Sequence, residues 1–142
     1  TYHMEKNNDQ LTRKLHESFS TNMFDQCVAM AAPDVIITAH ALGMTFQGWE
    51  AFSQFMAGFK QAFPDMVIHH DNLTVDGKYV AVQFTATGTH TGPLQTPSGD
   101  IPPSGKKVTL QVAEFLEWEN GMLTKLTNYQ DSGSLMRQIG AM

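Results

Sequence analysis

Two long runs of alternating residues, joined by Asn120-Gly121, constrain the fold of this chain more than any other feature. Asn-Gly favours a two-residue type I′ turn, because both central residues there adopt positive φ. We therefore predict a hairpin in which Glu119 pairs with Met122 and, by counting back, Glu114 pairs with Thr127. Side chains alternate faces along a strand, so one face of the first strand is an apolar row that includes Glu114. The apolar members of this row are Val108, Leu110, Val112, Leu116 and Trp118.

Glu114 is the charged residue in that row, and its position suggests a role in proton transfer. Burying a carboxylate among apolar side chains is costly unless the group is paired, solvated or protonated. Ionisable groups in such surroundings are candidates for proton transfer. In the counted register, Thr127, Tyr129 and Asp131 share the face of Glu114. The alternative is a β-bulge, which would shift the parity by one residue and turn Glu114 toward water.

Bulk composition limits the class of protein. The chain has 142 residues, with 42% hydrophobic and 16% charged residues, which is typical of a globular protein. We expect one domain over residues 1–142. We leave Thr1–His3 out of the fold prediction, because we interpret them as non-native residues that precede a native Met4. The net charge of −5 comes from scattered acids and predicts no nucleic-acid face. No apolar run approaches the ~20 residues of a membrane helix, so we expect no membrane association.

Cysteine and histidine usage argues against metal and redox chemistry. Cys27 is the single cysteine, so an internal disulfide is impossible and a reducing cytoplasmic location is expected. Cys27 fits a short buried helix better than a nucleophilic site. No His or Cys spacing matches a metal site, and no glycine-rich phosphate loop is present. We therefore expect neither a metal nor a cofactor.

Helical periodicity predicts three further elements in the first half of the chain. Residues 5–20 form an amphipathic pattern, and a second short helix ends before Pro33. A strand follows over 35–40 and ends at His40. A third helix begins after Gly48, and its aromatic stripe is either core or the wall of a pocket. The stripe consists of Trp49, Phe52, Phe55, Met56, Phe59 and Phe63.

A second hairpin is predicted around Asp76-Gly77, followed by a long loop. The residues that its counted register turns inward are His69, Asp71 and His90, whereas His70 would lie on the surface. An inward His is either a hydrogen-bonded core residue or an acid–base group. His90 stands at a strand end beside the Gly- and Pro-rich segment 91–105, which would be a lid, a binding loop or a mobile surface segment.

The order of elements predicts an α+β fold. Two helices, one or two strands and a helix precede four strands and a short closing helix. Consecutive long hairpins favour a curved, largely antiparallel sheet with the helices gathered on one side.

Several segments resemble the SnoaL-like polyketide cyclases of the NTF2-like superfamily, and the similarity extends from about residue 10 to the end. They are Phe46–Phe52, Thr87–Gly92, Ile101–Val108, the turn Glu119-Asn120-Gly121, and Asp131 with Leu135–Gly140. The resemblance implies a cone in which a curved mixed or antiparallel sheet wraps around three helices and encloses one apolar cavity. It also implies a homodimer joined through the sheet. The scaffold hosts enzymes and plain binders alike.

In the cyclases that this chain resembles, an aspartate on the last strand is the general acid/base of an aldol ring closure, without metal or cofactor. Asp131 matches it best, while many relatives carry another Asp where this chain has Asn128. Relatives often show an acid near Glu114 as well. The resemblance thus implies Asp131 and Glu114 as proton-transfer groups. Such chemistry also needs a hydrogen-bond donor to stabilise the enolate oxygen, and we expect His90 or Tyr129 to provide it.

We therefore hypothesise a cofactor-free enzyme that cyclises or isomerises a hydrophobic carbonyl compound. The expected substrate-binding residues are His40, Trp49, Phe52, Met56, His69, Asn128 and Tyr129. A second hypothesis is a non-catalytic carrier of an apolar small molecule, suggested by the aromatic stripe and the nine methionines. A third is an assembly module that uses a Thr-rich sheet face.

Overall fold

The computed structural model describes the backbone of residues 2–142 and the side chains of residues 7–142, so the expected remnant Thr1–His3 lies outside the described side chains. The helices are α1 (Tyr2–Ser20), α2 (Phe24–Ala29), α3 (Trp49–Ala62) and α4 (Ser132–Gln138), with a 3-10 turn η1 (His40–Leu42). The strands are β1 (Ala31–Ala39), β2 (Met44–Gln47), β3 (Val67–Asp76), β4 (Tyr79–Thr89), β5 (Leu94–Thr96), β6 (Gly99–Ile101), β7 (Lys107–Glu119) and β8 (Met122–Gln130).

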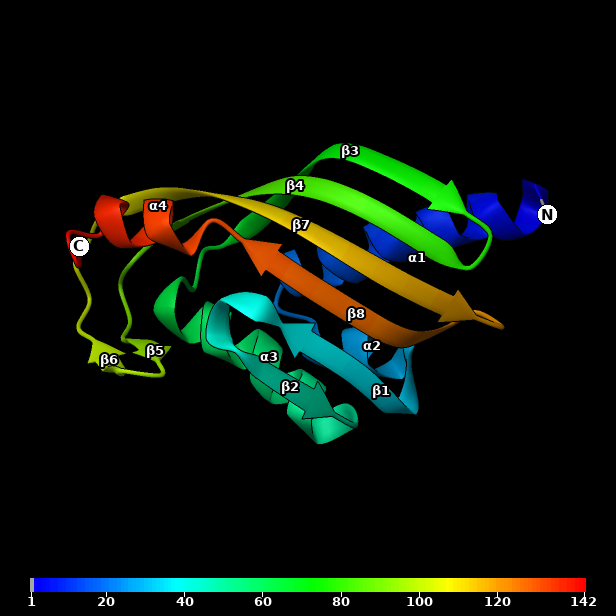
Figure 1. The fold of residues 1–142 in the computed structure, drawn as a ribbon, viewed down its shortest axis with the longest axis horizontal. Coiled ribbons are helices and arrows are strands. Elements are labelled where there is room, and N and C mark those ends of the chain that lie inside the picture. The colour runs from blue at the N-terminus through cyan, green and yellow to red at the C-terminus, as the bar shows by residue number, and fades with distance from the viewer. Residues whose placement is uncertain (1) are drawn as a thin grey trace.

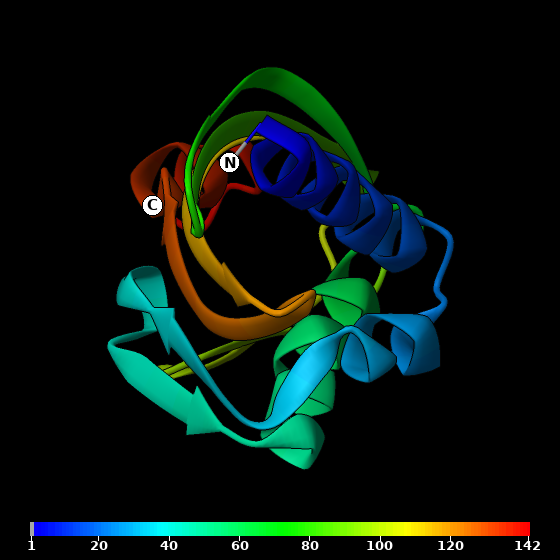
Figure 2. The ribbon, with the colours of Figure 1, turned by 90° about the vertical axis from the view of Figure 1, so that its right-hand side faces the viewer.

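Six strands form one curved sheet in the order β2-β1-β8-β7-β4-β3 (Figure 1). The β1–β8 pair is parallel and the other neighbours are antiparallel, so the sheet is mixed. The sheet curls around α1 and α3, with α2 beside them (Figure 2). The predicted α+β fold, with a curved sheet wrapped around three helices, is confirmed.

The core lies between the concave face of the sheet and these helices. The predicted amphipathic helix is confirmed by α1, where Leu15 and Phe19 are buried. Trp118 of β7 is 2% exposed, and its indole Nε1–H donates to Oγ1 of Thr12 over 2.9 Å. Cys27 is buried in α2, as expected of a small apolar residue. The contacts of Leu15 and Trp118 hold α1 against the inner face of the sheet.

The β7–β8 hairpin turns at Asn120 (φ 52°) and Gly121 (φ 78°), and Glu119 pairs with Met122 as predicted. The predicted pairing of Glu114 with Thr127 is wrong. An extra residue in β8 shifts the register next to Glu117, and Glu114 lies opposite Asn128. The hydroxyl of Thr124 donates to the carbonyl of Glu117 over 3.1 Å at this point. The inward residues of β8 near Glu114 are therefore Leu126, Asn128 and Gln130.

The β3–β4 hairpin also departs from the counted register. Asp76 pairs with Tyr79, so the two-residue turn lies one position later than predicted. A bulge between His70 and Asn72 then changes the parity of the first half of β3. The prediction that His69 points inward is wrong: His69 is exposed and His70 is partly buried. Asp71, also predicted inward, is exposed and accepts a hydrogen bond from Oγ1 of Thr85 over 2.6 Å.

The segment 91–105 is more ordered than the loop that its composition predicts. It contains the β5–β6 hairpin, and Leu94 is buried. Gly92 permits this path, because a Cβ there would lie 1.8 Å from the carbonyl oxygen of Gln61 at the end of α3. The backbone N–H groups of Thr91 and Gly92 donate to the carbonyl of Ala62, so the start of this segment is held against the end of α3.

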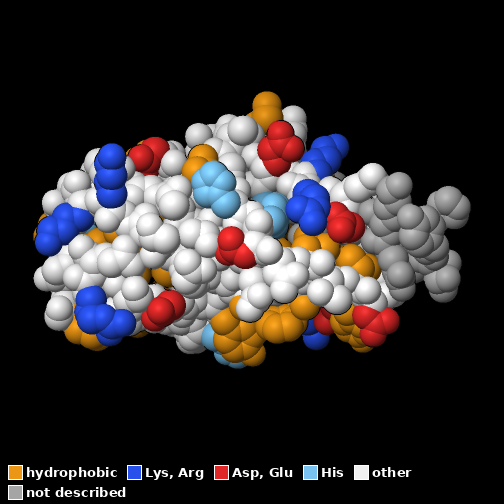
Figure 3. Space-filling view, turned by 90° about the horizontal axis from the view of Figure 1, so that it is seen from above, with side chains coloured by type: hydrophobic (Ala, Val, Ile, Leu, Met, Phe, Trp, Pro, Cys, Tyr) orange, Lys and Arg blue, Asp and Glu red, His pale blue; other side chains and the backbone are white. Residues whose placement is uncertain are grey.

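Acidic and basic side chains are interspersed on the face of the molecule that Figure 3 shows. Within residues 2–142, none of the helices combines the length and hydrophobicity that crossing a bilayer requires. In the same described part of the chain, His, Cys, Asp and Glu side chains form no group of three or more suited to hold a metal ion.

Candidate functional site

An apolar cavity lies between the concave face of the sheet and the helices α1 and α3. It has a volume of about 60 Å³ and continues into open solvent. Its polar lining residues are His16, Glu114, Asn128 and Gln130. The other walls are Leu15, Phe19, Phe52, Phe55, Met56, Phe59, Met66, Ile68, Phe84, Ala86, Leu110, Val112 and Leu126. The polar groups therefore face a space whose remaining surface is carbon and sulfur.

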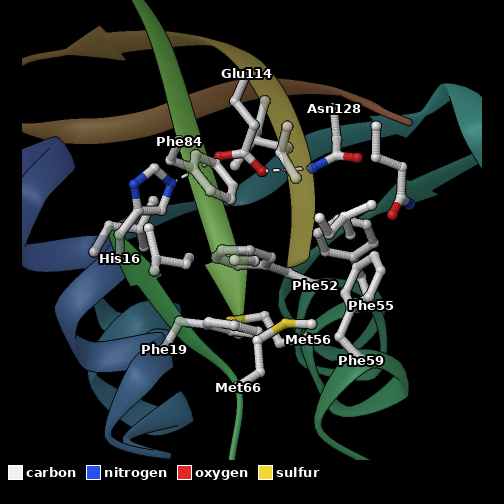
Figure 4. Close-up of a pocket in the computed structure, with 17 residues that line it drawn as sticks. His16, Phe19, Phe52, Phe55, Met56, Phe59, Met66, Phe84, Glu114 and Asn128 are labelled. Carbon is white, nitrogen blue, oxygen red and sulfur yellow. Dashed lines mark hydrogen bonds and ion pairs between the residues drawn. The ribbon is translucent and has the colours of Figure 1, made fainter. Parts of the chain in front are cut away.

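Glu114 is the carboxylate of this cavity, and it is 5% exposed. β7 turns it inward between Val112 and Leu116, as the alternation of the row predicts. Its Oε1 lies 2.7 Å from Nε2 of His16, and its Oε2 accepts a hydrogen bond from Nδ2 of Asn128 over 2.7 Å (Figure 4). Both oxygens are thus hydrogen-bonded, which offsets the cost of burying the group.

His16 is the candidate site residue that the sequence analysis missed. It belongs to the buried stripe of α1, one turn after Thr12 and next to Leu15, and is 4% exposed. Its second ring nitrogen, Nδ1, lies 2.7 Å from Nε2 of His70 on β3, and the two rings stack with centroids 4.9 Å apart. Glu114, His16 and His70 therefore form a continuous hydrogen-bonded chain from the cavity to a partly exposed side chain.

The protonation of this chain follows from its partners. An ionised Glu114 accepts only, so Nε2 of His16 must carry the proton between them. Burial first, and the neighbouring His16 second, lower the pKa of His70 to about 4. His70 is therefore neutral at pH 7, and a neutral imidazole can either donate to or accept from His16. The chain can move a proton to or from Glu114 in two steps.

The low pKa of His70 predicts a pH-dependent stability. Between its ordinary pKa of 6.5 and about 4, the unfolded chain binds a proton that the folded chain does not, so stability falls as pH falls through this window. We expect the loss to be about 1–2 kcal/mol, because His70 is partly exposed and solvent screens the effect. Urea unfolding at pH 7 and pH 4 measures it. His70→Asn should lose less unfolding free energy between pH 7 and pH 4 than wild type does. The exposed control His69→Asn should lose as much as wild type. Equal losses in all three proteins would contradict the assignment of this pH dependence to His70.

Asp131, the predicted acid/base, lies outside the cavity. It follows the end of β8 and caps α4, where its Oδ1 accepts a hydrogen bond from the backbone N–H of Ser134 over 3.1 Å. The side chain is exposed. The counted register placed Asp131 on the same face of the sheet as Glu114, and the extra residue in β8 changes that parity.

Four of the predicted substrate-binding residues lie on the outside of the molecule: His40, Trp49, His69 and Tyr129. Tyr129 is 45% exposed and stacks on His40, with ring centroids 4.3 Å apart. Trp49 is also 45% exposed, and its indole N–H donates to the carbonyl of Ala31 over 2.9 Å. His69 is a fourth outside residue, as described above. Phe52 and Met56, in contrast, line the cavity, as does Asn128.

His90 is fully buried at the end of β4, as its parity predicts, but it does not line this cavity. Its Nδ1 accepts a hydrogen bond from the backbone N–H of Ser104 over 3.1 Å and lies 2.9 Å from the hydroxyl of the same residue. Burial lowers the pKa of His90. These contacts join the end of β4 to the segment before β7.

Comparison with known proteins gives the family. The family model described as SnoaL-like polyketide cyclase matches residues 9–139. The chain belongs to the SnoaL-like polyketide cyclase family. A search of proteins with curated descriptions found no match.

Solved structures similar to this SnoaL-like chain confirm the NTF2-like cone. A protein from Jannaschia sp. CCS1, provisionally described as a SnoaL-like polyketide cyclase, is 23% identical, with a TM-score of 0.87 over 98% of this chain and 95% of that chain. AclR from Streptomyces galilaeus, provisionally described as a hydroxylase, is 17% identical, with a TM-score of 0.84 over 97% and 87%. An NTF2-like protein of unknown function from Burkholderia pseudomallei K96243 is 23% identical, with a TM-score of 0.75 over 94% and 97%. At these identities the likeness establishes the fold alone.

The floor of the cavity in this SnoaL-like protein is formed by an amide as well as a carboxylate. Asn128 cannot exchange a proton near neutral pH, so acid–base chemistry in the cavity falls to Glu114 and His16. Among the described side chains that line the cavity, these two are the ionisable ones.

Proposed function

We propose that this protein is an acid–base enzyme of the cyclase or isomerase type, which acts without a cofactor on a small carbonyl compound. The observation that carries the proposal is the buried Glu114–His16 pair, 2.7 Å apart, at the wall of an apolar cavity. A base held in low-dielectric surroundings next to a proton donor is the arrangement that abstraction of a proton beside a carbonyl requires. Membership in the SnoaL-like family supports the same reaction class.

In this mechanism Glu114 takes a proton from the carbon next to the carbonyl group. The electron pair of that C–H bond becomes the enolate, and the N–H of His16, which donates to Oε1 of Glu114 over 2.7 Å, holds the carboxyl in position. The proton then returns from Glu114 to another carbon in an isomerisation, or to the new alkoxide in an aldol closure. The partly exposed side chain of His70 on β3 contacts His16 and so connects the pair to the surface of the protein. Asp131 has no role in this proposal.

The size of the cavity bears on the substrate. A volume of about 60 Å³ is smaller than a typical ligand pocket, so a ring compound requires its walls to move. Met56 and Met66 are the lining residues best able to do so, because Met is unbranched and flexible.

Deuterium exchange tests the reaction without knowledge of the natural substrate. Wild-type protein should accelerate exchange at the carbon next to the carbonyl in a graded panel of ketones in D₂O (acetone, cyclopentanone, acetophenone and 1-tetralone), followed by proton NMR. Glu114→Gln should lower the rate on the best ketone by about 100-fold, because general-base catalysis contributes at least that much.

Asp131→Asn is the matched control, since it neutralises an exposed carboxylate outside the cavity. Its rate should equal that of wild type. Equal rates for wild type and Glu114→Gln would refute the enzyme proposal. Ketone binding without exchange would instead support the carrier.

We also propose that the protein is a homodimer joined through the outer face of the sheet. This face carries three aromatic side chains that are about half exposed, at Tyr79, Phe115 and Tyr129. In sedimentation velocity, wild-type protein should be a dimer, and Phe115→Lys should shift the equilibrium toward the monomer. A monomeric wild-type protein would refute the proposal.

A further inference from the structure

The ring of His70 stands between the buried Glu114–His16 pair and the surface of the protein. Its Nε2 lies 2.7 Å from Nδ1 of His16, and the two rings stack with their centroids 4.9 Å apart. His16 and Glu114 line the cavity, whereas His70 does not. His70 therefore contacts the pair from behind the cavity wall.

The second ring nitrogen of His70 reaches solvent. Among the described residues, Nδ1 of His70 has no hydrogen-bond partner, and the side chain is only partly buried. In the same part of the chain, the buried side-chain atoms that lack a partner belong instead to His90, Asn128 and Gln130. One nitrogen of His70 thus faces water, and the other faces His16.

Both ring nitrogens of His16 are covered by protein groups. His16 is 4% exposed, its Nε2 lies 2.7 Å from Oε1 of Glu114, and its Nδ1 faces His70. The other carboxylate oxygen, Oε2, accepts from the amide of Asn128, which does not exchange a proton near neutral pH. A proton from water therefore reaches Nδ1 of His16 through the ring of His70, also while a compound fills the cavity.

The groups around His70 keep its ring neutral at pH 7. Burial first, and then His16 and Arg13, lower its pKa to about 4. Glu114 and Asp9 oppose this shift, and Asp9 is paired with Arg13 on α1 over 2.6 Å. A neutral imidazole has one donor and one acceptor nitrogen, so it can take a proton on one nitrogen as it gives one up from the other.

We propose that His70 is a proton relay, through which the Glu114–His16 pair takes up and releases one proton without access from the cavity. His70 acts through His16 and does not touch the substrate, so it is a positioning residue. This inference rests on the proposed function, because it concerns the same pair, and it adds how the protonation of that pair is controlled.

The relay moves one proton and changes the charge of His16 alone. Before uptake, the Nε2–H of His70 donates to Nδ1 of His16, and the Nε2–H of His16 donates to ionised Glu114. A proton from water then binds Nδ1 of His70, while the N–H bond at its Nε2 breaks and that proton passes to Nδ1 of His16. His70 stays neutral, and His16 becomes an imidazolium beside Glu114. The positive charge lies at the cavity wall, where it can offset the negative charge of an enolate.

The rate at which Nδ1 of His16 gains and loses a proton tests the relay. It is measured by ¹⁵N relaxation dispersion of histidine-labelled protein, near the pH midpoint of the His16 titration. We expect two interconverting forms in wild type, with Nδ1 either bare or protonated and Nε2 protonated in both. A His16 ring that keeps one protonation state between about pH 5 and pH 9 would overturn the proposal.

His70→Gln separates proton transfer from hydrogen bonding. The Gln amide can donate to or accept from Nδ1 of His16, but it cannot pass a proton on. We expect the interconversion rate to fall at least about tenfold, while the titration midpoint stays within about 0.5 pH unit. His69→Gln, at the exposed neighbouring position of β3, is the matched control and should leave both quantities unchanged. A rate in His70→Gln equal to that of wild type would overturn the proposal.

Two further measurements separate loss of the relay from loss of structure. His70→Phe keeps an aromatic ring against His16 and should slow the interconversion as His70→Gln does, which keeps the test decisive if one variant folds poorly. The indole N–H of Trp118, which donates to Thr12, reports opening of the contact between α1 and β7, and its exchange with water should be the same in all variants. A slower His16 rate that is accompanied by altered Trp118 exchange in both variants would overturn the relay.

These readouts require no ketone. The relay can therefore fail while the enzyme proposal stands, and absence of deuterium exchange into ketones leaves the measured proton transfer at His16 unaffected.

Discussion

Replacing His16 with Leu is expected to lower the free energy of unfolding at pH 7 by about 3–5 kcal/mol. The side chains of His16 and Glu114 are only 5% and 6% exposed and lie 2.7 Å apart. Removing one partner of a buried pair leaves the other charged, desolvated and without its hydrogen bond, which is far more costly than the pair itself is stabilising. Urea unfolding followed by far-UV circular dichroism measures the change.

The double variant His16→Leu/Glu114→Gln distinguishes an unpaired charge from simple loss of packing. Gln keeps an oxygen that can accept from Asn128 but carries no charge, so the double variant should recover about half of the loss. His69→Leu, on the exposed side of β3, should stay within about 0.5 kcal/mol of wild type. A double variant no more stable than His16→Leu would contradict the proposed origin of the effect.

The sequence predicted elements well where a local pattern determines them. The Asn120-Gly121 turn, the inward row of β7 and the amphipathic α1 are confirmed because alternation, positive φ and helical spacing are local properties. The strand registers were wrong because β8 contains an extra residue, β3 contains a bulge, and the turn between β3 and β4 lies one position later than predicted. The hydrogen bond from Thr124 to the carbonyl of Glu117 lies at the extra residue of β8.

The candidate site was predicted in part for the same reason. Glu114 was found because a charge in an apolar row violates a local pattern. His16 was missed because its partner lies 98 residues away, and its helix was analysed only for its apolar stripe. The sequence did contain a signal that His16 is buried, because His16 lies one helical turn after Thr12 and next to Leu15. Asp131 was misplaced because the extra residue in β8 changes the parity of the strand, and Asp131 follows its end as the cap of α4.

Replacing Trp118 with Ala is expected to destabilise the fold by about 3–5 kcal/mol and to weaken the Glu114–His16 contact indirectly. Trp118 is 2% exposed, so its removal loses buried apolar area and leaves a cavity. It also removes the indole donor from Oγ1 of Thr12, one helical turn before His16 on α1. The two contacts, Thr12 to Trp118 and His16 to Glu114, join the same helix to the same strand. Urea unfolding measures the loss of stability, and NMR of the His16 ring measures the change at the site.

Trp118→Phe separates the two contributions to this effect. Phe retains most of the buried ring but lacks the N–H, so it should cost less than Ala and still leave the hydroxyl of Thr12 without its donor. Thr12→Val, which removes the acceptor, should have little additional effect in the Trp118→Phe background, because the bond is already absent. An unchanged His16 ring spectrum in Trp118→Ala would show that the position of His16 is independent of Trp118. Additive losses for Trp118→Phe and Thr12→Val would show that the 2.9 Å hydrogen bond does not stabilise the docking of α1 on β7.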